Sequence, residues 1–231
     1  MLDFFNSDCI SLKICGITQA STAQALIELG VDALGFNFWP QSKRYLEPQQ
    51  AQTWLPKIQH LSPHPTKQPI IKIGLFVNQS LAQIQELYQQ GFFDYAQLHG
   101  EETPSFTKEL ISLGIPCIKA LRIKDEQDIP LVTEFSHTGI SALLLDAYHP
   151  QEQGGSGHSF DWELISHPSI QQTAIPIILA GGINTSNISK AAQVPGIVAL
   201  DLASGAESSP GKQDLEKVSL LLNKLTTSIR N

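Results

Sequence analysis

The sequence predicts a single (β/α)8 barrel, in which a closed ring of eight parallel strands is surrounded by helices. Short apolar runs recur along the whole chain, and most are continuous enough to be strands buried on both faces. Helical patterns follow nearly every run, and the 231 residues contain no stretch typical of a linker. An α/β barrel of this length commonly forms one domain. We therefore expect one barrel over residues 1–231, with residues 1–10 as a short N-terminal lead.

The candidate strands share a high content of β-branched and other apolar residues. They are residues 12–17, 33–38, 70–77, 95–100, 117–123, 142–147, 175–183 and 196–203. Counted in order, they supply the eight strands that the barrel needs.

The helical segments between these runs carry recognisable end signals. Segment 22–30 ends on a glycine that can serve as C-cap, and segment 80–91 begins on an N-cap serine and ends on a glycine. Segment 213–225 is amphipathic, whereas the sixth helix, near residues 161–166, has the weakest pattern. An open doubly wound sheet is the alternative fold, but it usually carries a GxGxxG turn after an early strand, and the sequence has none.

Composition narrows the class of function. The net charge of -7 and the pI near 5.4 argue against nucleic-acid and anionic-membrane partners. No apolar run approaches the ~18 residues of a membrane span, and the N-terminus does not resemble a signal peptide. Cys9, Cys15 and Cys117 show no CxxC spacing, which argues against a zinc site or a disulfide framework. We expect a cytoplasmic protein.

Reactive side chains stand at the carboxyl ends of the candidate strands, where barrel active sites lie. They are Cys15, Lys43 and Arg44, Gln97 and His99, Arg122, Asp146, and Asp201. The first and sixth strands face each other across a closed ring of eight, so a thiol and a carboxylate should oppose one another at the mouth. This arrangement suits general acid–base catalysis.

The proposed base and acid each have a structural alternative. Lys13 points to the same side of its strand as Cys15, so its ammonium could lower the pKa of the thiol. A lone cysteine on an apolar strand is nevertheless usually a packing residue, as we expect for Cys117. Burial could raise the pKa of Asp146 and make it a proton donor, but a carboxylate at a strand end can also be a cap or a salt-bridge partner.

Two glycine-containing loops follow the seventh and eighth candidate strands, at residues 179–184 and 202–211. Loops at these positions form the phosphate site of many barrels, because glycine lets backbone N–H groups approach an anion. Ser204 and Asn184 could add side-chain donors, and we interpret Glu207 as a helix N-terminal residue. A longer polar loop, residues 148–162, holds Gly154, Gly155 and Gly157 and is either a lid over the site or a surface loop without function.

The segments LKICGIT, ALGFNFWPQSKRYL, IGLFVN, QLHGEE, LLLDA, GGSGHSFDW, ILAGGIN and LDLASGAESSPGKQD resemble, in order, the motifs of phosphoribosylanthranilate isomerases. The resemblance extends from about residue 12 to residue 225. It implies a single barrel of tryptophan biosynthesis that needs no metal and no organic cofactor. The implied reaction converts N-(5-phospho-β-D-ribosyl)anthranilate to 1-(2-carboxyphenylamino)-1-deoxy-D-ribulose 5-phosphate, an Amadori rearrangement.

The resemblance also implies roles for particular residues. The family's general base falls on Cys15, its general acid on Asp146 and a substrate-binding arginine on Arg44. The family's phosphate-binding loops fall on Gly181, Gly182, Ser204, Gly205 and Ala206. We expect Gln97, His99 and Asp201 to contact the substrate as well.

Some features depart from the family pattern or remain open. His158 stands where a lysine is common, PGKQD replaces the frequent PGKKD, and the connection at residues 63–69 is longer than expected. Other phosphate-binding barrels, such as indole-glycerol-phosphate synthase, an epimerase or a thiamin-phosphate synthase, are rival interpretations, and so is a sugar-phosphate-binding regulator without turnover. The chain is expected to be a monomer or a homodimer.

Overall fold

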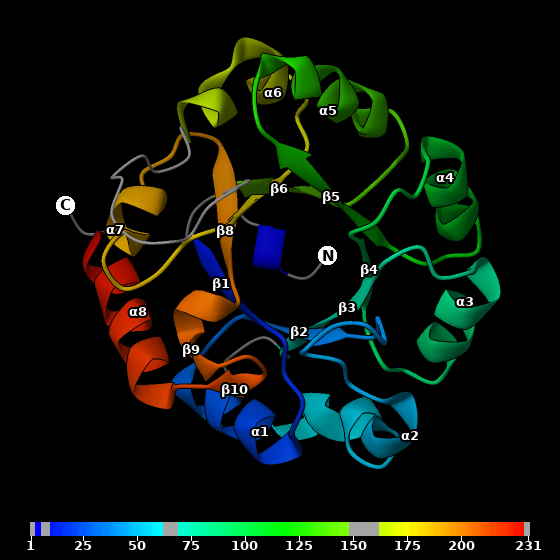
Figure 1. Cartoon of the computed structure of the whole chain (residues 1–231), viewed down its shortest axis with the longest axis vertical. Coiled ribbons are helices and arrows are strands. Elements are labelled where there is room, and N and C mark those ends of the chain that lie inside the picture. The colour runs from blue at the N-terminus through cyan, green and yellow to red at the C-terminus, as the bar shows by residue number, and fades with distance from the viewer. Residues whose placement is uncertain (1–2, 6–9, 62–68, 148–161, 229–231) are drawn as a thin grey trace.

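Eight parallel strands close into a barrel in the computed structural model, which describes residues 3–5, 10–61, 69–147 and 162–228 (Figure 1). The strands are β1 (Ser11–Cys15), β2 (Ala33–Asn37), β3 (Ile71–Phe76), β4 (Tyr95–Leu98), β5 (Cys117–Ile123), β6 (Ala142–Ala147), β7 (Ile177–Ala180) and β8 (Ile197–Leu202). They pair in chain order, and β8 pairs with β1 to complete the ring. The predicted (β/α)8 barrel is therefore confirmed.

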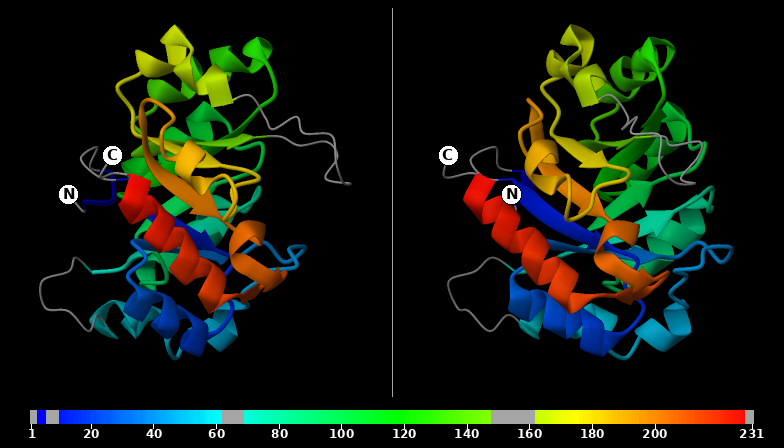
Figure 2. Two further views of the ribbon diagram at one scale, coloured as in Figure 1. Left: turned by 90° about the vertical axis from the view of Figure 1, so that its left-hand side faces the viewer. Right: turned by 60° about the vertical axis from the view of Figure 1, so that its left-hand side comes forward.

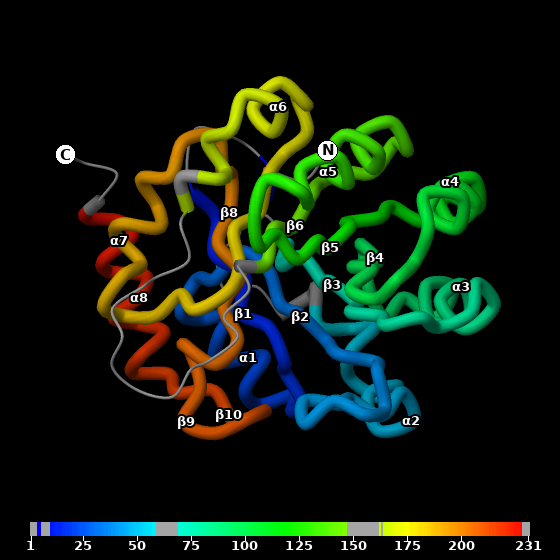
Figure 3. The backbone as a smooth tube through the Cα atoms, turned by 45° about the horizontal axis from the view of Figure 1, so that its top comes forward, coloured from blue at the N-terminus to red at the C-terminus, as the bar shows by residue number. Residues whose placement is uncertain are grey.

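Helices surround this ring on the outside (Figures 1 and 3). They are α1 (Ala20–Leu29), α2 (Pro48–Ala51), α3 (Leu81–Gln89), α4 (Pro104–Ser112), α5 (Ile129–Ser136), α6 (Pro168–Gln171), α7 (Ile188–Ala191) and α8 (Leu215–Ser228). In side view α8 runs along the outside of the barrel, and it contacts α1 and α7 (Figure 2). No helix in the described ranges is long and apolar enough to cross a membrane.

The end signals in the sequence act as expected. Gly30 has φ 92° and its N–H donates to the carbonyls of Leu26 and Ile27, which ends α1. Ser80 and Gln83 form a reciprocal capping box at the start of α3. The weak sixth helical pattern corresponds to a 3-10 helix (Trp162–Ser166) followed by the four residues of α6.

The buried apolar side chains form two layers, one between the strands and the helices and one inside the ring. The inner layer includes Ile73, Ile118, Leu144 and Ile178. Phe4, from a 3-10 helix at residues 3–5, is 3% exposed and joins this inner layer. Figure 1 shows that short helix in the middle of the ring. Part of the N-terminal lead therefore packs inside the barrel.

A buried ion pair joins β5 to the loop after β4. Lys119 Nζ lies 2.8 Å from Glu102 Oε2 and donates to the carbonyl of Gly100 at 2.7 Å. Glu102 also accepts from the backbone N–H groups of Asn78 and Gly100. One carboxylate thus fixes the loops after β3 and β4 to the next strand.

Replacing Glu102 should destabilise the barrel. Glu102→Gln leaves the buried Lys119 ammonium without its counter-charge, so we expect the free energy of unfolding to fall by about 3 kcal/mol. Urea denaturation followed by circular dichroism measures this change. The neighbouring, exposed Glu101 provides the control, because Glu101→Gln removes the same charge from the surface. Equal losses from both substitutions would contradict the structural role of the buried pair.

Candidate active site

A cavity of about 290 Å³ opens at the carboxyl ends of the strands. Its walls come from both halves of the barrel and hold most of the reactive residues singled out in the sequence. The lining residues include Cys15, Arg44, His99, Asp146, Gly181, Gly182, Asp201 and Ser204. The fold therefore gathers side chains that are far apart in the chain around a single space.

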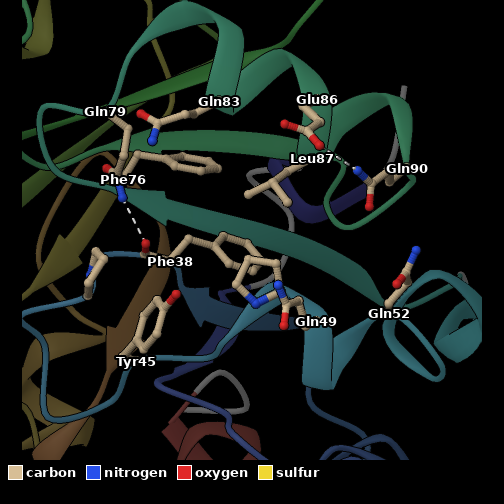
Figure 4. Close-up of a pocket in the computed structure, with 12 residues that line it drawn as sticks. Phe38, Tyr45, Gln49, Gln52, Phe76, Gln79, Gln83, Glu86, Leu87 and Gln90 are labelled. Carbon is tan, nitrogen blue, oxygen red and sulfur yellow. Dashed lines mark hydrogen bonds between the residues drawn. The ribbon is translucent and has the colours of Figure 1, made fainter.

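A second cavity, of about 420 Å³, lies on the outer side of the barrel between α2 and α3 (Figure 4). Figure 4 shows a wall built largely of glutamine side chains around Phe38 and Phe76. Tyr45 and Glu86 are the titratable side chains that line it, and none of the predicted site residues does. We therefore place the functional site at the strand ends.

Cys15 is the last residue of β1 and is 6% exposed. It lies opposite Gly35 of β2, where an added Cβ would be only 2.7 Å from the sulfur. Glycine at position 35 therefore leaves the space that the thiol occupies. Gly16, with φ 84°, follows Cys15 in the left-handed conformation that favours glycine.

Two opposing effects act on the pKa of the Cys15 thiol. Burial raises the pKa of the Cys15 thiol above its ordinary value of 9.0, and this effect is larger than the opposing effect of the Lys13 ammonium. The nearby Asp201 carboxylate also raises this pKa. The Lys13 ammonium lowers this pKa as expected, but the larger effect of desolvation cannot be predicted from the spacing of Lys13 and Cys15.

Asp146 lies near the end of β6, with its side chain 27% exposed, and lines the cavity beside His99, the residue that follows β4. Its Oδ2 atom is 3.6 Å from His99 Nε2. The thiol and the carboxylate thus line the same cavity from β1 and β6, as the strand order requires. One group can remove a proton and the other can donate one to a ligand held between them.

Three polar side chains fill the inside of the ring directly below this cavity. Lys13 is fully buried, and its Nζ donates to Asp201 Oδ1 and to Gln97 Oε1, both at 2.9 Å. Gln97, also fully buried, contacts His99 Nδ1 through its Nε2 at 3.0 Å. Asp201 lines the cavity, whereas the Gln97 side chain lies beneath it and reaches it through His99.

Arg44 reaches the cavity from the loop after β2 and forms a bidentate ion pair with Glu207. Its Nε and Nη2 atoms donate to Oε1 and Oε2 at 2.8 and 2.6 Å. Hydrogen bonding to Glu207 raises the pKa of the Arg44 guanidinium. Our interpretation of Glu207 as a helix N-terminal residue is wrong, because it follows a 3-10 helix (Ser204–Ala206) and begins β9 (Glu207–Ser209). Its pairing with Arg44, on another loop, is visible only in three dimensions.

The short hairpin of β9 and β10 (Lys212–Gln213) lies over the end of β1. Gln213 Nε2 donates to the carbonyls of Gly16 at 3.1 Å and Cys15 at 3.4 Å. Thr18 Oγ1 donates to the carbonyl of Gly211 at 3.1 Å. The PGKQD variation therefore supplies a side-chain amide that holds the turn after Cys15.

The two glycine loops lie side by side at one edge of the cavity. Gly181 and Gly182 have φ values of 89° and 64°, which favour glycine. A Cβ added to Gly205 would lie 1.9 Å from the carbonyl oxygen of Ile183, so the loops can approach only if residue 205 is glycine. Ala206 is buried, and its N–H donates to the carbonyl of Ala203.

The remaining residues singled out in the sequence lie outside this cavity or outside the described residues. Gly154, Gly155 and Gly157 of the predicted lid lie outside the described residues, as does Cys9. Cys117 is fully buried at the start of β5. Arg122 faces an adjoining cavity of about 750 Å³ that shares His99 with the first. Within the described ranges, no group of three or more His, Cys, Asp or Glu side chains is arranged to hold a metal ion.

The fold and the site define a (β/α)8 barrel whose cavity is bordered by the glycine loops after β7 and β8, the position at which many such barrels bind phosphate. Residues 12–224 match the family model described as N-(5'phosphoribosyl)anthranilate (PRA) isomerase, and the chain belongs to this family. An N-(5'-phosphoribosyl)anthranilate isomerase from Rippkaea orientalis is 39% identical over 216 residues, which cover 93% of this chain and 95% of that protein.

Solved structures agree with this assignment. A phosphoribosyl anthranilate isomerase from Thermotoga maritima is 32% identical, with a TM-score of 0.80, and the match covers 94% of this chain and 99% of that one. A further isomerase, solved in complex with reduced 1-(o-carboxyphenylamino)-1-deoxyribulose 5-phosphate, is 28% identical with a TM-score of 0.78. That match covers 94% of this chain and 99% of the other.

The raised pKa of Cys15 predicts how the thiol reacts without substrate. A thiol with a raised pKa is protonated at neutral pH, so its alkylation by iodoacetamide should increase with pH and have its midpoint above pH 9.0. Cys117, which is fully buried and whose pKa burial raises to about 12, is the internal control and should also remain unreactive at neutral pH. Mass spectrometry of the peptides after brief alkylation measures both. A midpoint near neutral pH for Cys15 would contradict the effect of burial.

Proposed function

We propose that Cys15 and Asp146 act as the base and the acid in the isomerisation of N-(5'-phosphoribosyl)anthranilate, a step of tryptophan biosynthesis. The observation that carries the proposal is the shared cavity, because a thiol from β1 and a carboxylate from β6 open onto the same space as the two glycine loops. A substrate whose phosphate is bound at those loops would extend across the mouth between the two groups.

The proposed reaction is an Amadori rearrangement with two proton transfers. Asp146 donates a proton to the ribose ring oxygen as the C1–O bond breaks, which gives an open-chain iminium ion. Cys15, as thiolate, then removes the proton from C2, and the electron pair forms an enolamine. The enolamine tautomerises to the ketone, so the product is an isomer of the substrate and no external oxidant or reductant takes part.

The raised pKa of Cys15 is compatible with a role as base. The iminium ion places a positive charge beside the sulfur, and a neighbouring cation favours the thiolate. Lys13 and Arg44 already act in this direction, although burial outweighs them in the ligand-free site. We therefore infer that the thiolate forms in response to substrate rather than in advance.

The remaining contacts bind the two ends of the substrate. The loops at Gly181, Gly182, Ser204 and Gly205 would receive the phosphate through backbone N–H groups. Arg44 binds Glu207 through Nε and Nη2, so its other N–H groups would be available to the anthranilate carboxylate. Glu207 would then set the orientation of a guanidinium that holds the aromatic end.

Assembly and location belong to the same proposal. A structural relative from Thermotoga maritima, 28% identical to this chain, is described as a dimeric phosphoribosylanthranilate isomerase from which monomers were generated. We expect this chain to be a monomer or a homodimer that acts on a small phosphorylated substrate in the cytoplasm.

Removing either proposed catalytic group should reduce turnover strongly. We expect Cys15→Ala and Asp146→Asn each to lower kcat by about 10²–10⁴-fold, since this is the usual contribution of general acid–base catalysis. Product fluorescence measures turnover, and circular dichroism verifies the fold. Cys117→Ala is the matched control, because it removes a buried thiol outside the cavity. A Cys15→Ala variant with normal turnover would contradict the proposed base.

Adding a methyl group at Gly205 should weaken phosphate binding. In Gly205→Ala the new Cβ would meet the carbonyl oxygen of Ile183, so the loops must separate. We expect KM to rise about tenfold and kcat to change less, as for the loss of aligned donors to an anion. Inorganic phosphate should inhibit the variant less strongly than the parent enzyme. Gly114→Ala, at an exposed glycine with open space around it, is the control that adds a methyl group without a steric contact.

A further inference from the structure

A line of polar contacts crosses the inside of the barrel and ends at the proposed acid. Lys13 Nζ lies 2.9 Å from both Asp201 Oδ1 and Gln97 Oε1. Gln97 Nε2 lies 3.0 Å from His99 Nδ1, and His99 Nε2 lies 3.6 Å from Asp146 Oδ2. The assignment of Cys15 as base and Asp146 as acid gives no role to Gln97 and His99, which lie between Lys13 and Asp146.

The ammonium at one end fixes the direction of the contacts that follow. An ammonium can only donate, so Gln97 must present its carbonyl oxygen to Lys13 and its NH₂ group to His99. An amide NH₂ group also only donates, so His99 Nδ1 must accept and carry no proton. The single proton of a neutral imidazole is then on Nε2, facing Asp146.

Burial keeps this arrangement in place. Both Lys13 and Gln97 are fully buried, so water cannot replace either contact. A rotated Gln97 amide would place its NH₂ group against the ammonium, and two donors cannot form a hydrogen bond with each other.

We propose that Gln97 is a positioning residue that holds His99 as the tautomer protonated on Nε2, so that His99 offers a donor and not an acceptor to Asp146. This inference rests on the proposed role of Asp146 as general acid and adds a reason for the QLH sequence on β4.

The consequence concerns the proton that Asp146 must deliver. A bare Nε2 atom would accept this proton and make Asp146 a poor donor to the substrate. A protonated Nε2 atom cannot accept it, and it interacts favourably with Oδ2. The proton of the acid is thereby left for the ring oxygen of the substrate.

Long-range ¹H–¹⁵N correlation spectra of the uniformly labelled full chain test the tautomer directly. At about pH 8, where an ordinary histidine is neutral, we expect a bare Nδ1 and a protonated Nε2 for His99. His99→Gln identifies the signals by their loss. His167 is an internal reference, because its Nδ1 accepts from the N–H of Ser169 at 3.2 Å. A protonated Nδ1 on His99 in the parent protein would overturn the proposal.

Two substitutions separate positioning from simple packing. Gln97→Glu keeps an acceptor for Lys13 but turns a second oxygen toward His99, so we expect a proton on Nδ1 and a fall in kcat of about tenfold or more with a smaller change in KM. Gln97→Met removes both polar groups, so we expect a mixture of tautomers and an intermediate kcat. The His167 signals should not change in either variant.

The outcomes distinguish the two proposals. A folded Gln97→Glu variant with a bare Nδ1, or with the parent kcat, would overturn the positioning role. If the Gln97→Glu variant fails to fold, the tautomer of His99 in the parent spectrum and in the Gln97→Met spectrum tests the positioning role. The tautomer is measured without turnover, so a parent protein that lacks isomerase activity would refute the proposed function and leave the spectroscopic result standing.

Discussion

The buried ammonium of Lys13 is the interaction on which the interior of the site depends. It lies inside the ring and joins β1 to Gln97 of β4 and Asp201 of β8. Burial by itself lowers the pKa of Lys13, but the Asp201 carboxylate, with a smaller contribution from Cys15, outweighs this effect and raises it. A cation buried in this way is tolerated because the Asp201 carboxylate and the Gln97 carbonyl oxygen contact it directly. It sets the electrostatics beneath the whole cavity.

The rim of the cavity is held by contacts of the same kind between loops that are distant in sequence. Arg44 and Glu207 join the loop after β2 to the one after β8, and Gln213 holds the turn that follows Cys15. Lys119 and Glu102 form a similar pair beside the adjoining cavity, between β5 and the loop after β4. The reacting groups therefore rest on paired charges and on hydrogen bonds between loops, which limit their movement before substrate binds.

Much of the site could be predicted because a barrel brings the ends of its strands together. Cys15 and Asp146 each follow an apolar run, and the strand order places them on opposite walls. The role of Glu207 and the direction of the Cys15 pKa shift could not be predicted in this way. Both depend on burial and on partners far along the chain. The spacing of residues within one strand gives no information about either. Gln97 is a similar case, because its orientation follows from Lys13 on another strand.

The sequence by itself determined the barrel, its strand order and the identity of the side chains at its mouth. Hydrophobic periodicity, helix caps and turn residues are local properties of the chain. Tertiary structure decided which of those side chains line the cavity, which lie beneath it and which are already paired. The physical reason is that protonation and hydrogen-bond direction are set by desolvation and by neighbours. For Cys15, Gln97 and Arg44, those neighbours come from strands and loops that only the closed ring brings into contact.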